Sequence, residues 1–80
     1  MSQRILLIQD DAAAAKIVID ALDQSSDATF KVEWVRRCSD GLEKLDGIEA
    51  ILVDLYLPDS RGIETFDAVF RAATKIPILV

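Results

Sequence analysis

Four stretches of the chain carry mostly apolar side chains, and polar segments separate them. They are residues 4–8, 30–35, 50–53 and 76–80. Continuous runs of Ile, Leu and Val are typical of parallel strands that helices cover on both faces. Lys31 and Glu33 interrupt the second stretch, which alternates apolar with polar residues and therefore belongs nearer to the edge of a sheet. The pattern predicts four strands.

The segments between the strands place apolar side chains at helical spacing, and they predict three helices. The first covers residues 12–24 and has Asp11 in the position of its N-cap. The second is short, with Ser39 as its cap and Gly47 as its stop. The third follows Gly62. Its apolar face consists of Ile63, Phe66, Phe70 and Ala73.

The alternation of strands and helices, with short connections, predicts a single α/β domain over residues 1–80. Its sheet is expected to be parallel and doubly wound, with the strand order 2-1-3-4 and right-handed crossovers. The last predicted strand, at residues 76–80, leaves an unpaired apolar edge. We therefore expect a fold that is incomplete at its C-terminus. If the 80 residues are the whole chain, the exposed edge predicts self-association, for example as a homodimer.

The charge and the rare residue types exclude several classes of function. A formal charge of −5 gives no electrostatic footprint for nucleic acid or for an anionic membrane surface, so we expect neither as a partner. Cys38 is the only cysteine, and no apolar span of about 18 residues occurs, which favours a reduced, cytoplasmic protein. Histidine is absent, which excludes Ser-His and Cys-His catalysis and the usual zinc sites. Any chemistry must depend on carboxylates.

Two acidic side chains stand where strands end. Asp10 follows the first predicted strand and Asp54 follows the third, and the order 2-1-3 brings both to the edge where open parallel sheets bind ligands. Two carboxylates that lie close together repel unless a cation neutralises them, and a site of few carboxylates and water favours Mg²⁺. The ion would screen an incoming phosphoryl group, which Asp54 would attack as the nucleophile. The main-chain carbonyl of Tyr56 offers a further oxygen.

Two motifs occur together in this order. An apolar strand ends in acids, and a second apolar strand ends in Asp-x-x-Leu-Pro-Asp-x-x-Gly at residues 54–62. The combination resembles the receiver domain of two-component response regulators over effectively the whole chain. The resemblance implies the flavodoxin-like (CheY-like) fold. It also implies that Asp54 is the phosphoacceptor, that Asp10 is the main Mg²⁺ carboxylate, and that the Tyr56 main-chain carbonyl is a further ligand.

The same resemblance implies partners and a function. A sensor histidine kinase or a phosphotransfer protein would donate the phosphoryl group, and an output domain or partner of unknown kind would read the signal. No enzymatic activity is implied beyond the Mg²⁺-dependent phosphorylation and dephosphorylation of Asp54.

The chain departs from the family at Gln9, because receivers usually have two consecutive acids directly after the first strand. A neutral amide can still hold a metal-bound water. We therefore expect Mg²⁺ binding to survive but to weaken by about 10- to 100-fold. In an alternative register, Asp10 and Asp11 form the acidic pair.

Two other classes of function fit the same architecture. One is a pseudo-receiver, a protein-interaction module that keeps the fold but takes no phosphate, and Gln9 is the ground for it. The other is an enzyme. A haloacid-dehalogenase-like phosphatase needs a second Asp two residues after its nucleophile, where this chain has Tyr56, and a dinucleotide enzyme needs a glycine-rich turn, where residues 9–12 contain no glycine. Both enzymes are disfavoured.

Overall fold

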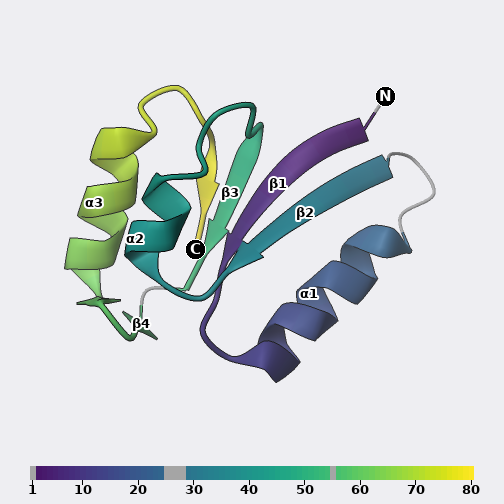
Figure 1. The fold of residues 1–80 in the computed structure, drawn as a ribbon, viewed down its shortest axis with the longest axis horizontal. Helices are drawn as coiled ribbons and strands as arrows, with labels where there is room; N and C mark the ends of the chain where they lie inside the picture. Colours follow the sequence, from purple (N-terminus) through teal and green to yellow (C-terminus); the bar gives the residue numbers. More distant parts are fainter. Residues whose placement is uncertain (1, 25–28, 55) are drawn as a thin grey trace.

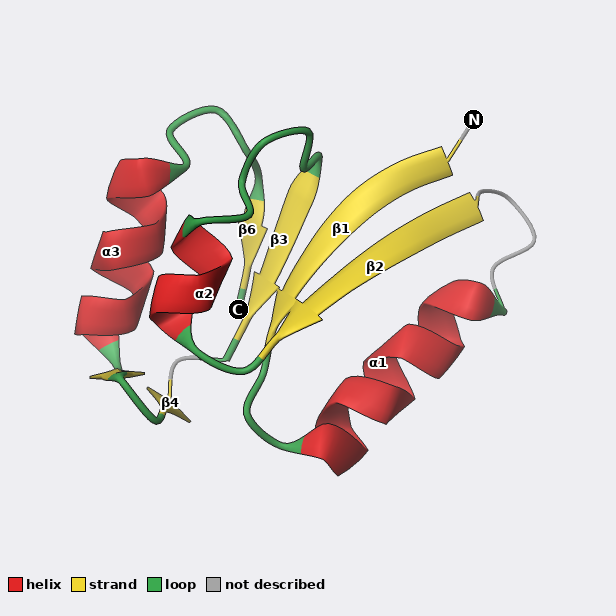
Figure 2. Cartoon of the chain, viewed as in Figure 1, coloured by secondary structure: helices red, strands yellow, loops and turns green. Residues whose placement is uncertain are grey.

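The computed structural model describes residues 2–24, 29–54 and 56–80. At its centre lies a parallel sheet with the strand order β2-β1-β3-β6 (Figure 1). The strands are β1 (Ser2–Ile8), β2 (Thr29–Val35), β3 (Ala50–Val53) and β6 (Ile78–Leu79). Helix α1 (Ala12–Asp23) lies on one side of the sheet, and α2 (Cys38–Leu42) and α3 (Ile63–Ala72) lie on the other (Figure 2). The predicted α/β class and the order 2-1-3-4 are confirmed, with β6 as the fourth strand of this sheet.

Strand β1 lies inside the sheet, because β2 pairs with one of its edges and β3 with the other. Side chains on both of its faces are buried. Leu6 and Ile8 are fully buried, and Ile5 and Leu7 on the opposite face are 6% and 3% exposed. Strand β2 is at the edge of the sheet, and of its residues only Val35 is buried. The continuous apolar run and the alternating run thus indicated the central and the edge strand correctly.

The segment after β3 forms an antiparallel hairpin that the sequence pattern did not indicate. Strand β4 (Tyr56–Leu57) pairs with β5 (Ser60–Arg61), and the turn between them contains Pro58 and Asp59. The hairpin ends at Gly62, whose φ of 59° and ψ of −133° are accessible to glycine and rarely to other residues. Gly62 therefore allows the chain to turn from the hairpin into α3.

Helix α2 differs from its prediction at both ends. It begins at Cys38 with Arg37 in the N-cap position, so the prediction that Ser39 is the N-cap was wrong. It ends at Leu42. Gly47 follows later, with a φ of 77°, in the loop that leads to β3. A distant side chain, that of Asp59, caps the N-terminus of this helix.

Candidate functional site

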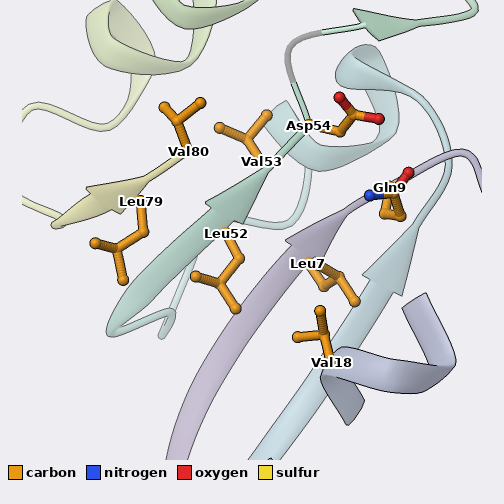
Figure 3. Close-up of a pocket in the computed structure, with 8 residues that line it drawn as sticks. All are labelled: Leu7, Gln9, Val18, Leu52, Val53, Asp54, Leu79 and Val80. Carbon is orange, nitrogen blue, oxygen red and sulfur yellow. The ribbon is translucent and has the colours of Figure 1, made fainter. Parts of the chain in front are cut away.

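Gln9 and Asp54 line one open cavity of about 490 Å³ at the carboxyl ends of the central strands (Figure 3). Gln9 directly follows β1, and Asp54 directly follows β3. The rest of the cavity wall is apolar and consists of Leu7, Val18, Leu52, Val53, Leu79 and Val80. Figure 3 shows the two polar side chains near the ends of their strands, Val18 on α1, and the other apolar side chains along β1, β3 and the end of β6. The polar groups of this cavity are thus confined to the strand ends.

The register of the sheet determines where Asp54 lies. Ile8 of β1 is paired with Val53 of β3, and the main-chain N–H of Asp54 donates to the main-chain oxygen of Ile8 at 2.9 Å. The Asp54 residue is half-buried, so a reaction partner can reach it from solvent. Asp10 lies one residue beyond Gln9 and is exposed. Both acids therefore lie at the carboxyl ends of two paired parallel strands, β1 and β3.

Gln9 is held by three hydrogen bonds that involve three different atoms. Its main-chain N–H donates to the Val35 oxygen at 3.0 Å, and its main-chain oxygen accepts from the Trp34 indole Nε1 at 2.8 Å. Its side-chain Oε1 accepts from the Asp11 main-chain N–H at 3.1 Å. An amide oxygen has two lone pairs, so Oε1 can accept a second hydrogen bond, from a metal-bound water, beside the one from Asp11. The water-mediated metal contact through Gln9 stays a prediction.

Asp11 is the N-cap of α1. Its backbone is extended, with φ −82° and ψ 116°, and its Oδ1 accepts from the Ala13 main-chain N–H at 2.9 Å. The predicted N-cap is therefore confirmed. The alternative register, in which Asp11 is a metal ligand, would require the carboxylate to serve the helix and the ion together.

The donor set at this edge consists of two carboxylates and neutral oxygens. Within the described residues, no group of three or more His, Cys, Asp or Glu side chains could hold a metal ion. Mg²⁺ is commonly held by one or two carboxylates with water completing its shell, so Asp10 and Asp54 suit it. The main chain of Tyr56, which was predicted to supply a further oxygen, belongs to β4 and is paired with Arg61. Leu55, between the strand and the hairpin, lies outside the described residues.

Asp59 has a role that no pattern in the sequence indicates. Its Oδ1 accepts from the Cys38 main-chain N–H at 2.9 Å, and its Oδ2 accepts from the Ser39 main-chain N–H at 3.0 Å. Burial alone would raise the pKa of Asp59, but these hydrogen bonds outweigh burial and hold the pKa below its ordinary value. The hairpin thus caps α2, whose N-cap residue Arg37 makes no side-chain cap. Because the partners are 21 and 20 residues apart, no local pattern reveals this contact.

The thiol of Cys38 lies beneath this cap. Burial raises the pKa of Cys38, and the negative charge of Asp59 raises it further. A thiol with a raised pKa carries little thiolate at neutral pH and is a poor nucleophile. Cys38 is therefore a small apolar residue of the core, as its place in the buried cluster also shows.

The chain is similar in sequence to bacterial regulatory proteins. No family model matches it. The swarming motility regulation protein RssB of Serratia marcescens is 37% identical over 78 residues, which cover 95% of this chain and 34% of that protein. The cell cycle response regulator CtrA of Brucella ovis is 35% identical over 79 residues, which cover 96% of this chain and 33% of that protein. The chain thus spans about a third of the length of these relatives.

Two solved structures share the fold. The non-phosphorylated HemR receiver domain from Leptospira biflexa has a TM-score of 0.73 and 26% identity, and the match covers 95% of this chain and 60% of that one. The MaeR response regulator bound to beryllium trifluoride has a TM-score of 0.82 at 20% identity, and the match covers 96% of this chain and 64% of that one. Its likeness concerns the fold alone.

Fold and strand-end acids together define an α/β domain of the receiver class, and the relatives agree with that class. The chain belongs with the receiver domains of response regulators, as its two motifs predicted.

Proposed function

We propose that the chain is the phosphoacceptor domain of a two-component system, in which Asp54 receives a phosphoryl group with Mg²⁺ as the cofactor. The observation that carries this proposal is the position of Asp54. It is half-buried at the end of β3, in register with the end of β1, and Asp10 follows two residues after Ile8. The response-regulator relatives support the signalling class.

The donor in this proposal is a phosphohistidine of a sensor histidine kinase or of a phosphotransfer protein. When bound, Mg²⁺ supplies positive charge that screens the phosphoryl oxygens. A carboxylate oxygen of Asp54 attacks the phosphorus in line, the P–N bond of the donor breaks, and the imidazole leaves with the electron pair. The sheet contributes position, because the hydrogen bond from the Asp54 N–H to Ile8 holds the main chain of the nucleophile. We propose no enzymatic activity beyond this phosphorylation and the later hydrolysis.

Phosphorylation adds charge at the edge of the sheet, and this charge would bias a surface that an output domain or partner reads. The chain spans about a third of the length of RssB and CtrA. An output domain or partner that reads the phosphorylated state is therefore part of this proposal. We place the domain in the cytoplasm, where Cys38 would stay a free thiol. Across the segments that the structure describes, no helix has the length and apolarity to span a bilayer.

Incubation with MgCl₂ and acetyl phosphate, followed by intact-mass measurement, tests the proposal. We expect one phosphoryl adduct on the wild-type protein, its removal by hydroxylamine, and its absence after EDTA treatment or in Asp54→Asn. Asp46→Asn is the matched control, because Asp46 is exposed in the loop that precedes β3, at the opposite edge of the sheet. A wild-type protein that binds Mg²⁺ but takes no adduct would contradict the proposal.

That negative outcome would favour the pseudo-receiver. The observation in its favour is Gln9, which removes one negative charge from the edge and directs its amide oxygen to the Asp11 N–H. A protein-interaction module of this kind would need the fold and not the phosphoryl group.

A further inference from the structure

Trp34 makes a contact that neither the sequence nor the proposed chemistry requires. It lies near the end of β2, its indole Nε1 donates to the main-chain oxygen of Gln9 at 2.8 Å, and the residue is 36% exposed. This oxygen belongs to the peptide bond that joins Gln9 to Asp10. Trp34 therefore reaches across from the neighbouring strand to the peptide unit that carries the proposed metal carboxylate.

Along the described β1–β2 ladder, no main-chain N–H of β2 donates to the Gln9 oxygen. The last register pair of β1 and β2 is Ile8 with Val35, and the Gln9 N–H donates to the Val35 oxygen at 3.0 Å. In a continuing parallel ladder, the next donor to Gln9 would come from the backbone beyond Val35. The chain turns there into α2, whose N-cap is Arg37. The indole supplies the donor that the ladder no longer offers.

A hydrogen bond at this oxygen limits the movement of Asp10. The peptide group is planar, so a fixed Gln9 oxygen also fixes the N–H and the Cα of Asp10. The guanidinium of Arg36 lies 5.0 Å from the centroid of the indole ring, a contact with the ring that does not involve its N–H. Pre-ordering a ligand in this way lowers the entropy cost of binding.

We infer that Trp34 is a positioning residue for Asp10, and that it strengthens Mg²⁺ binding through the Gln9–Asp10 peptide. This inference rests on the proposed function, because it takes Asp10 as a metal carboxylate. It adds a residue that does not touch the ion and that acts only through the peptide oxygen.

Calorimetric titration with Mg²⁺ tests the inference on the wild-type protein, Trp34→Phe and Arg36→Gln. Trp34→Phe keeps an aromatic ring but has no N–H, and we expect the Kd for Mg²⁺ to rise about two- to tenfold, the effect of one hydrogen bond. Arg36→Gln is the matched control, because it removes the cation above the ring and leaves the N–H in place. We expect its Kd to stay within about twofold of the wild type. Equal Kd values for Trp34→Phe and the wild type would overturn the inference.

A second measurement needs no substitution at Trp34. It is the only tryptophan of the chain, so the tryptophan emission reports on the surroundings of this indole. We expect Mg²⁺ to change the emission of the wild type with the calorimetric Kd, and to leave the emission of Asp10→Asn unchanged. A wild-type emission that does not respond to bound Mg²⁺ would overturn the inference even if Trp34→Phe fails to fold. Absence of a phosphoryl adduct in a protein that passes both tests would count against the proposed function only.

Discussion

At the scale of single residues, Gln9 stands where receiver domains usually have the first of two consecutive acids after the first strand. Its side-chain oxygen accepts a hydrogen bond from the Asp11 N–H, and a carboxylate of the same length could accept the same bond. The charge at this edge of the sheet can therefore be changed without loss of the local contact. This separates the electrostatic role of the residue from its structural role.

Gln9→Glu should strengthen Mg²⁺ binding. The added carboxylate brings a further negative charge to the strand ends that carry Asp10 and Asp54, and we expect the Kd for Mg²⁺ to fall about 10- to 100-fold, as measured by calorimetry. Lys75→Gln is the control, because it changes the net charge by the same amount in the loop before β6, at the opposite edge of the sheet. Unchanged Mg²⁺ affinity in Gln9→Glu would show that residue 9 has no part in the site.

Gly62→Ala should destabilise the fold through the backbone alone. A Cβ at this position meets no atom within 4 Å, but φ is 59° and ψ is −133°. We expect the free energy of unfolding in urea to fall by about 1–2 kcal/mol, the strain of this conformation less the entropy that alanine removes from the unfolded chain. Thr74→Ala, an exposed substitution next to α3, should change it by less than about 0.5 kcal/mol. Equal stability of the two variants would mean that Gly62 is not needed for the turn.

At the scale of elements, α2 depends on two contacts with distant segments. The Asp59 carboxylate accepts from the first two amides of the helix, and its pKa lies below the ordinary value. On the other side, Gly41 brings the helix backbone onto β1, because an added Cβ would lie 2.5 Å from Ile8 Cδ1 and 2.9 Å from Ile8 Cγ1. A helix of five residues has little stability of its own, so these contacts hold it in place.

The Asp59 cap predicts a defined pH dependence. The pKa of Asp59 is lowered on folding, so its stabilising contribution is complete above the ordinary value of 3.8 and is lost as the pH falls through the lower folded pKa. At pH 7 we expect Asp59→Ala to lower the free energy of unfolding by about 1 kcal/mol or less, since the carboxylate is largely exposed. The difference between variant and wild type should shrink below pH 3.8 in urea titrations. Asp46→Ala serves as the control, and a difference that is independent of pH would contradict the cap.

Gly41→Ala tests the contact of α2 with β1. Ile8 is fully buried and cannot move away freely, so we expect a loss of about 1–3 kcal/mol in the free energy of unfolding. Ile8→Val removes the Cδ1 atom that the new methyl group would meet. In that background Gly41→Ala should cost less, and the double-mutant cycle measures the difference. If the effects of Gly41→Ala and Ile8→Val on the free energy of unfolding are additive, the loss in Gly41→Ala does not come from the contact with Ile8.

At the scale of the whole molecule, one edge of the sheet is formed by β6, which pairs with β3 on its other side. Leu79 and Val80 at this edge are 59% and 73% exposed. The self-association expected from the sequence stays a prediction, and sedimentation velocity over a range of concentrations would measure it. Leu79→Lys should reduce association, whereas Ile17→Lys, at a site on α1 that is 70% exposed, should not. A wild type that remains monomeric at high concentration would contradict it.

Much of this fold could be predicted from the sequence, because its main features depend on local patterns. Continuous apolar runs indicated the central strands, alternation indicated that β2 is an edge strand, and Asp11 was predicted as an N-cap. The edge that holds Asp10 and Asp54 followed from strand order. The β4–β5 hairpin, the Asp59 cap and the Trp34 contact were missed, because the two side-chain contacts join residues 20 to 25 positions apart and depend on geometry that exists only after folding. Whether the acids bind Mg²⁺ stays a prediction.

The Asp59 cap also provides two amide groups whose hydrogen exchange reports on movement of the β4–β5 hairpin. The amides of Cys38 and Ser39 donate to a carboxylate that belongs to a segment five residues after Asp54. Their hydrogen–deuterium exchange should therefore be slow while the hairpin is docked and fast when it swings away. The exchange rates of these two amides, measured before and after treatment with a phosphodonor, would show whether phosphorylation of Asp54 changes the contact between the hairpin and α2.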